Sequence, residues 1–130
     1  MVLGESLGTG LATYLASKRK LEGLILYASY PSLLKVASSK LKIYPLEYLL
    51  KYPIPADNWA PSVRIPVLSI HGAKDTLIPI ELGKEQSDHF PKATFFPIQG
   101  ANHNDWLKFV DGDFVNKLNN FVQQSLKGAE

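Results

Sequence analysis

Ser6 stands in the stretch "GESLG" near the start of the chain, between Gly4 and Gly8. A serine hydroxyl becomes a nucleophile when it is held on a sharp turn from a strand into a helix, and this turn needs small residues on both sides of the serine. The apolar residues before Gly4 and the helical pattern after Gly8 fit such a turn. The alternative interpretation is a simple glycine-containing turn in which Ser6 caps the helix.

The same glycines could belong to a phosphate-binding loop, but their spacing does not fit one. A P-loop needs a lysine followed by serine or threonine, and this stretch has no lysine. A dinucleotide-binding fingerprint begun at Gly8 and Gly10 needs glycine or alanine at position 13, where the chain has Thr13. Both motifs are therefore discarded, and we expect no cofactor and no metal.

A serine nucleophile needs a general base, and the base needs an acid that orients it. His103 lies in the loop "GANHND" after one apolar run, and Asp75 lies in "HGAKD" after the preceding one. We expect His71 to be a structural residue near the site and His89 to be a helix-end or exposed residue. Asp105 is expected to cap the last helix. The other aspartates considered are interpreted as solvated charges or caps: Asp57, Asp88, Asp111 and Asp113.

Hydrophobic periodicity predicts the elements that position these residues. The apolar runs "GLILYAS", "IPVLSIHG" and "ATFFPIQG" predict strands, the first of them buried on both faces as in a parallel sheet. Helices are predicted over 7–20, 80–89 and about 106–126. Prolines divide the segment 31–61 into short helical pieces, such as 46–52, and we interpret this segment as a lid-like insert.

Two of the predicted helices carry apolar residues at helical spacing. In the first, Leu7, Leu11 and Leu15 recur every four residues, and we expect this face, with the small Gly8 and Ala12, to approach the sheet closely. The last helix has a longer expected buried stripe: Leu107, Val110, Phe114, Leu118, Phe121 and Val122.

The order of elements predicts an α/β fold with three to four parallel strands flanked by helices. In such a sheet the loops after the strands meet at one edge. Ser6, Asp75 and His103 each follow a predicted strand, and the strand before Ser6 is short. The three residues occur in the chain order serine, aspartate, histidine that is known for one class of serine triads. We therefore expect the three side chains to lie together.

The composition limits the remaining function classes. The chain has 130 residues, 45% of them hydrophobic, which suits one globular domain. Its net charge of +2 arises from basic and acidic residues spread along the sequence, so nucleic-acid binding is not expected. Cysteine is absent, which excludes disulfides and thiolate sites. Apolar stretches are far shorter than the roughly 20 residues of a membrane span.

The stretches "GESLGTGLA", "IPVLSIHGAKDTLIP" and "GANHNDW" resemble the nucleophile elbow, acid loop and histidine loop of the alpha/beta-hydrolase superfamily. The resemblance is greatest to the branch whose histidine loop reads GxxHND, which includes depalmitoylase-like proteins. It implies that Ser6 attacks an acyl carbonyl, His103 carries the proton, and Asp75 orients the imidazole. It also implies that the backbone N–H of Leu7 is one oxyanion donor. The implied substrate is a small or acylated ester or thioester.

The chain departs from this family at its start, because several strands and a second oxyanion donor normally precede the elbow. We therefore interpret residues 1–130 as the C-terminal part of one hydrolase domain, with the N-terminal strands missing. The apolar strand "LILYA" would then have an unpaired edge. A complementing N-terminal half is the expected partner. The default compartment is the cytoplasm, although a targeting or anchor region could belong to the missing part.

Two alternatives to an enzyme remain open. The chain could be an inactive remnant in which the motifs persist as structure, or a small ligand-binding or interaction module.

Overall fold

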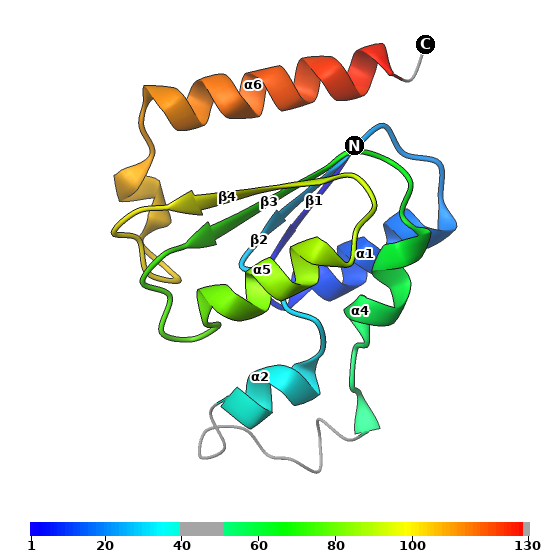
Figure 1. Cartoon of the computed structure of the whole chain (residues 1–130), viewed down its shortest axis with the longest axis vertical. Coiled ribbons are helices and arrows are strands. Elements are labelled where there is room, and N and C mark those ends of the chain that lie inside the picture. The colour runs from blue at the N-terminus through cyan, green and yellow to red at the C-terminus, as the bar shows by residue number, and fades with distance from the viewer. Residues whose placement is uncertain (40–50, 129–130) are drawn as a thin grey trace.

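A parallel four-stranded sheet forms the middle of the molecule (Figure 1). The computed structural model describes residues 1–39 and 51–128. Each strand lies beside its neighbour in the chain, and all three pairings are parallel. The strands, in their order across the sheet, are β1 (Val2–Glu5), β2 (Leu24–Tyr27), β3 (Val67–Gly72) and β4 (Ala93–Ile98). The predicted α/β fold with flanked parallel strands is thereby confirmed.

Helices cover both faces of this sheet (Figure 1). On one side lie α1 (Gly8–Lys18), α4 (Ala56–Trp59) and α5 (Ile80–Asp88), and on the other lies α6 (Gly112–Lys127). The short α2 (Leu33–Ser39) lies away from the sheet, at the bottom of the view. The 3-10 helices are η1 (Ala60–Ser62) and η2 (Trp106–Phe109). The segment 31–61 thus contains α2, α4 and part of η1. The helical piece predicted over 46–52 lies, as far as residue 50, outside the described residues.

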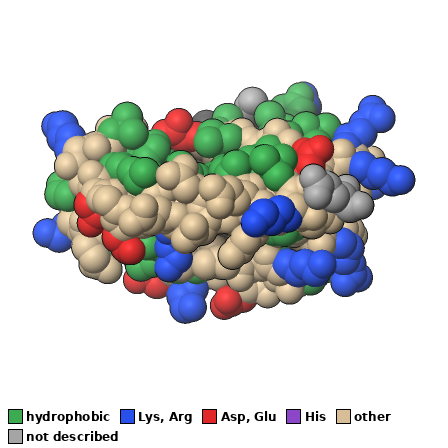
Figure 2. All heavy atoms as spheres, turned by 90° about the horizontal axis from the view of Figure 1, so that it is seen from above, with side chains coloured by type: hydrophobic (Ala, Val, Ile, Leu, Met, Phe, Trp, Pro, Cys, Tyr) green, Lys and Arg blue, Asp and Glu red, His purple; other side chains and the backbone are tan. Residues whose placement is uncertain are grey.

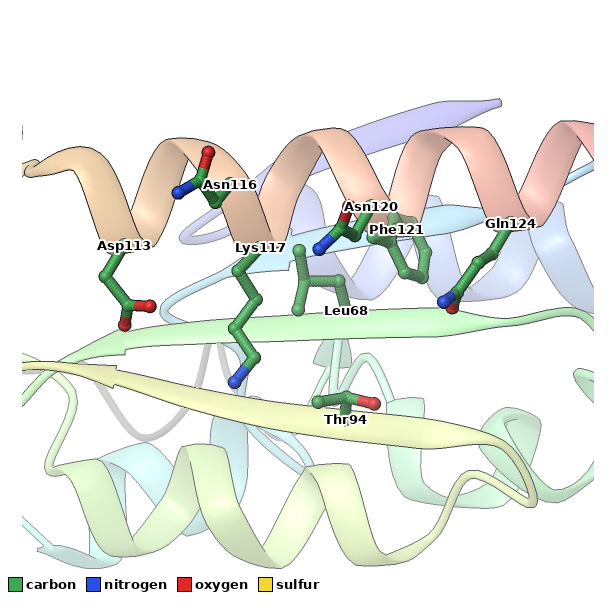
Figure 3. A pocket seen from close by; sticks show the side chains of 8 residues that line it. All are labelled: Leu68, Thr94, Asp113, Asn116, Lys117, Asn120, Phe121 and Gln124. Carbon is green, nitrogen blue, oxygen red and sulfur yellow. The ribbon is translucent and has the colours of Figure 1, made fainter.

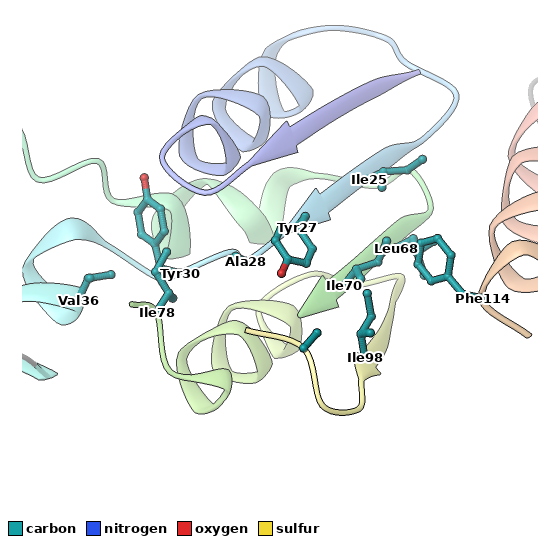
Figure 4. Close-up of a cluster of buried hydrophobic side chains, with 11 residues drawn as sticks. Ile25, Tyr27, Ala28, Tyr30, Val36, Leu68, Ile70, Ile78, Ile98 and Phe114 are labelled. Carbon is teal, nitrogen blue, oxygen red and sulfur yellow. The ribbon is translucent and has the colours of Figure 1, made fainter. Parts of the chain in front are cut away.

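The two faces of the sheet belong to two separate hydrophobic clusters. Because side chains alternate along a strand, Leu24 and Leu26 pack with Ala12 and Ala16 of α1. Ile25 and the other residues of the opposite face form the second cluster with Phe114 of α6 (Figure 4). The β2 side chains are all buried, as the continuous apolar run predicts for a central parallel strand.

The prediction for the packed face of the first helix is wrong. Leu7, Leu11 and Leu15 are 56%, 62% and 40% exposed. The residues of this stretch that are buried are small: Thr9, Gly10, Ala12, Thr13 and Ala16. Small side chains let the helix axis approach the sheet more closely than leucines would, and the leucines consequently face outward.

The expectation of an unpaired β2 edge is also wrong. β1 pairs with β2 over four residues, from Val2 with Leu24 to Glu5 with Tyr27. β1 is therefore the strand at this edge of the sheet, and Leu3 at its centre is 67% exposed. The short N-terminal segment provides enough backbone to complete the pairing of β2.

The predicted last helix is interrupted. Residues 106–109 form η2, Val110 and Asp111 are extended, and α6 begins only at Gly112. The Asp111 carboxylate accepts a hydrogen bond from the backbone N–H of Phe114 at 2.9 Å, and it therefore caps α6. Leu107, expected in the buried stripe, is 70% exposed because it belongs to η2 and lies out of phase with α6.

Candidate active site

Ser6 occupies the turn between β1 and α1, and its backbone is in the left-handed region with φ 50°. This conformation costs a residue other than glycine about 1–3 kcal/mol, so the surrounding structure must hold it. The Ser6 N–H donates to the Tyr27 carbonyl at 2.9 Å, and the Ser6 carbonyl accepts from the N–H of Thr9 at 3.0 Å. No side chain caps the start of α1, so the hydroxyl of Ser6 does not act as a helix cap.

Gly4 makes this turn sterically feasible. A Cβ atom at position 4 would lie 2.7 Å from the Cβ of Ala12 and 2.9 Å from the carbonyl oxygen of Gly8. Such distances are shorter than side chains adopt, so only glycine lets α1 fold back so closely on β1. A Cβ atom at position 8 would meet no other atom within 4 Å, so the packing of this turn does not require glycine there.

Ser6, His103 and Asp75 form a continuous chain of hydrogen bonds. The Ser6 hydroxyl lies 3.0 Å from His103 Nε2, and His103 Nδ1 lies 2.7 Å from Asp75 Oδ2. With the proton on Nδ1, the imidazole donates to the carboxylate and its Nε2 accepts from the hydroxyl. Asp75 and His103 are buried, which keeps water from competing for these bonds. The structure therefore brings together the three residues that the sequence selects.

The second carboxylate oxygen of Asp75 is held by the backbone of its own loop. Asp75 Oδ1 accepts from the N–H of Leu77 at 2.9 Å and of Ile78 at 2.8 Å. These two donors fix the orientation of the carboxylate toward His103. The acid is thus positioned before any substrate arrives.

Two residues that sequence reasoning missed hold the histidine loop. The Tyr27 hydroxyl donates to the carbonyls of Asn102 and His103 at 3.1 and 3.3 Å. Asn102 Oδ1 accepts from the N–H groups of Thr76 and His103, which joins the acid loop to the histidine loop. A tyrosine at the end of an apolar strand is a weak sign of such a role, and Asn102 carries no sequence signal at all.

Asp105 does not cap a helix, contrary to the expectation. Its side chain accepts from the backbone N–H of Asn102 at 2.6 Å, so it closes the turn that presents His103. Asp111 performs the capping instead, because α6 begins farther along the chain than predicted.

His71 is a buried neighbour of the triad, with no exposed surface. Its Nε2 lies 2.7 Å from the carbonyl of Ile78 and 3.5 Å from Asp75 Oδ2. Burial lowers the pKa of His71 below its ordinary value, and His103 also lowers it, while the Ile78 carbonyl, Asp75 and Glu81 act in the opposite direction. The neutral ring donates from Nε2 to Ile78 and so supports the loop that contains the acid.

This lowered pKa predicts a loss of stability in mild acid. Below about pH 6.5, the unfolded chain protonates His71 while the folded protein still resists doing so. The free energy of unfolding should therefore fall as the pH decreases through this range, by up to about 1.4 kcal/mol per pH unit, until the folded-state pKa is reached. Urea unfolding between pH 5 and 8 would measure this. His71→Asn should have a shallower pH slope than the wild type, and equal slopes would refute the assignment.

The chain is similar in sequence and in fold to several known proteins. An uncharacterized protein of Mycobacterium tuberculosis is 34% identical over 111 residues, covering 84% of this chain and 39% of that protein. Alpha/beta hydrolase domain-containing protein 17C of Homo sapiens is 28% identical, covering 99% of this chain and 38% of the relative. The solved structure of MGS-MChE2, an alpha/beta hydrolase enzyme from lagoon sediments, matches with a TM-score of 0.69 at 19% identity, over 94% of this chain and 60% of that one. The chain therefore has part of the alpha/beta-hydrolase fold and is related in sequence to alpha/beta hydrolase domain-containing proteins.

The part of the alpha/beta-hydrolase fold present here is limited. The chain spans about two fifths of the length of the curated relatives it matches. A second structure of similar kind, the enol-lactonase from Burkholderia xenovorans, gives a TM-score of 0.67 at 14% identity over 93% of this chain and 64% of that one. No family model matches the chain.

The N–H of Leu7 stands at the start of α1 in this hydrolase fold, directly after Ser6. Among the described residues it donates no hydrogen bond. The amino end of a helix carries partial positive charge, so this N–H is polarised to donate a hydrogen bond to a negative oxygen. The structure thus leaves the expected oxyanion donor available.

Two cavities of this chain differ in the residues that line them. One, of about 180 Å³, has Ser6 in its wall and is otherwise bounded mainly by apolar side chains. The other, of about 310 Å³, lies between α6 and the sheet, where Asp113, Lys117 and Gln124 extend from the helix toward Leu68 and Thr94 (Figure 3). It shares no residue with the first cavity and includes none of the triad, so the chemistry belongs to the first.

Seen from above, lysine and arginine side chains protrude at both ends of the molecule, fewer acidic side chains lie among them, and hydrophobic side chains gather along the upper part of the view (Figure 2). Within residues 1–39 and 51–128, no three histidine, aspartate and glutamate side chains are grouped so that they could hold a metal ion. None of the helices described there has the length and apolar character needed to cross a bilayer.

Proposed function

We propose that this chain carries the reacting groups of a serine hydrolase that acts on carboxylic esters or thioesters. The observation that supports this most strongly is the unbroken contact from Ser6 through His103 to Asp75, at 3.0 and 2.7 Å. Both distances are within the range in which a proton can be transferred or held. A histidine in contact with a serine and oriented by a third group is the pattern of an activated nucleophile.

The proposed reaction has two halves. The Ser6 oxygen attacks the acyl carbon while its proton passes to His103 Nε2, and Asp75 stabilises the imidazolium that forms. His103 then gives this proton to the departing alcohol or thiol, which leaves the acyl group bonded to Ser6. Water then attacks the acyl-enzyme while His103 accepts its proton. The bond from the acyl carbon to Ser6 breaks, His103 returns the proton to the Ser6 oxygen, and the carboxylic acid is released.

The negative oxygen of the intermediate requires donors. We assign the Leu7 N–H as one of them. Loss of a single oxyanion donor costs roughly 100- to 1000-fold in turnover, so a hydrolase with one donor is slow. We propose that a complementing N-terminal half supplies the second.

A docking position for that half is available along β1. This strand has an exposed edge, and Leu3 at its centre is 67% exposed. An edge strand pairs readily with a further strand, and an apolar side chain there favours such a partner. The length of the relatives, more than twice that of this chain, supports the same proposal.

The test is covalent labelling with a fluorophosphonate probe, which reacts with activated serines. The folded chain should acquire one label, located on Ser6 by mass spectrometry, and Ser6→Ala should acquire none. Ser38→Ala is the matched control, because Ser38 lies on the exposed side of α2, and its labelling should equal that of the wild type. A correctly folded wild type that is never labelled would instead support the inactive remnant or the ligand-binding module.

A further inference from the structure

An apolar pocket adjoins Ser6, and His103 is not among the residues that line it. Its volume is about 180 Å³. Ser6 and Leu7 lie at one part of its wall, and the remainder is formed by Tyr30, Leu33, Val36, Leu77 and Ile78. Tyr30, Val36 and Ile78 gather at the same end of the hydrophobic cluster (Figure 4).

The polar side-chain atoms that line this pocket are already engaged. The Tyr30 hydroxyl donates to the Leu7 carbonyl at 3.0 Å, and burial raises the pKa of Tyr30 so that the hydroxyl keeps its proton. The Ser6 hydroxyl is in contact with His103. A ligand in the pocket would therefore meet mainly hydrocarbon, and a polar or charged group there would lose its water without finding a partner.

Three residues of the pocket wall are buried and well packed. Tyr30, Val36 and Ile78 are 1%, 4% and 4% exposed. Ile78 is held through its N–H by Asp75 and through its carbonyl by His71. The loop that fixes the catalytic acid thus also forms one wall, and the pocket cannot widen there without disturbing the triad.

The position of His103 decides which part of an ester would enter this pocket. The departing alcohol or thiol must receive its proton from His103, so it has to leave on the histidine side of Ser6. Around His103 lies a second hollow, whose wall includes Thr76, Asn102, His103 and Asp105 and which shares Leu77 with the apolar pocket. The acyl chain stays bonded to Ser6 through both halves of the reaction, and the apolar pocket is the space left for it.

We infer that this pocket binds a short, linear, saturated acyl chain of up to about six carbons, and that longer chains do not fit. The inference rests on the proposed function. A heavy atom of a chain occupies about the 30 Å³ of a water molecule, so the pocket holds roughly six of them. It is also smaller than the roughly 300–1,000 Å³ of sites for drug-sized ligands.

Chain length should affect binding in a characteristic way. Each methylene that enters an apolar pocket strengthens binding by about fourfold. From acetate to hexanoate, four methylenes are added, so the dissociation constant should fall by about 250-fold. Beyond hexanoate the added methylenes remain in water or clash with Tyr30 and Val36, and the dissociation constant should stop falling or rise.

The experiment is a titration of methyl esters, from acetate to dodecanoate, into full-length Ser6→Ala with methyl-labelled Val, Leu and Ile residues. Ser6→Ala cannot hydrolyse the esters, so binding is measured without turnover. We expect NMR shifts at the methyl groups of Val36, Leu77 and Ile78, with affinity that increases to hexanoate and then levels off. If Ser6→Ala does not fold, methyl alkyl ketones replace the esters with the wild-type chain.

A variant pair tests whether Val36 limits the chain. Val36→Phe fills the pocket and should weaken hexanoate binding at least tenfold relative to acetate. Leu34→Phe is the matched control on the same helix, because Leu34 is 40% exposed and does not line the pocket, and it should leave this ratio unchanged.

Several results would overturn the inference: no shift at these methyl groups, affinity that keeps rising to dodecanoate, or equal effects of the two phenylalanine variants. These outcomes are independent of the labelling test. A break at hexanoate in a protein that is never labelled would retain the pocket and refute the hydrolase, whereas labelling without the break would refute the pocket alone.

Discussion

Replacing Ser6 with alanine is expected to lower kcat by roughly a millionfold, because the oxygen that forms the acyl-enzyme is gone. His103→Ala should have a similar effect, since an unassisted hydroxyl is a poor nucleophile at neutral pH. Hydrolysis of a p-nitrophenyl ester with a short acyl chain measures both. Because the two residues act as one unit, the double variant should be no slower than either single variant.

The control for this series is Ser38→Ala, whose serine lies outside the site and should leave kcat within a factor of two of the wild type. Circular dichroism and the urea midpoint would verify that each variant is folded. A double variant slower by the product of the two single effects would show that Ser6 and His103 act independently, which contradicts the proposed proton transfer.

Asp75→Asn is expected to reduce kcat by about 10⁴-fold with little change in the fold. The amide oxygen of asparagine can still accept the N–H groups of Leu77 and Ile78, which now bond to Asp75 Oδ1. The amide nitrogen, however, is a donor and would face His103 Nδ1, so the ring would place its proton on Nε2. His103 could then no longer accept the Ser6 proton.

Asp88→Asn is the matched control for this change, because Asp88 is exposed at the end of α5 and forms no hydrogen bond with a triad residue. The pH profile of turnover adds a second measurement. The changed tautomer of His103 should lower turnover at every pH and should not shift only the acidic or the basic side of the profile. A loss below tenfold for Asp75→Asn would indicate that the carboxylate is structural and does not orient the base.

Much of the site could be predicted because its signals are local. Each reacting residue directly follows an apolar run and stands beside glycine or other loop residues, so sequence position alone indicated the edge of a parallel sheet. The positive φ of Ser6 and the close contact at Gly4 are the physical reasons for the spacing of the first motif. The contacts of Tyr27 and Asn102 that hold the histidine loop join residues far apart in the sequence, so local sequence patterns cannot predict them.

The errors concern which surface a helix buries and where it begins. Leu7, Leu11 and Leu15 have the spacing of a buried face, but in α1 the distance between helix and sheet is set by the small residues on the other side. Hydrophobic spacing identifies a face and does not say whether a sheet or another segment covers it. The predicted start of the last helix is too early because the apolar spacing continues through η2. The helix α6 begins only after Asp111, whose carboxylate caps it.

The contact between Ser6 and His103 joins residues that are 97 positions apart. Reactivity at the serine can therefore exist only in molecules whose two chain ends have already docked, and a covalent tag on Ser6 would record that docking. Applied in short pulses during refolding, such a probe would time the last step of assembly without any added fluorophore.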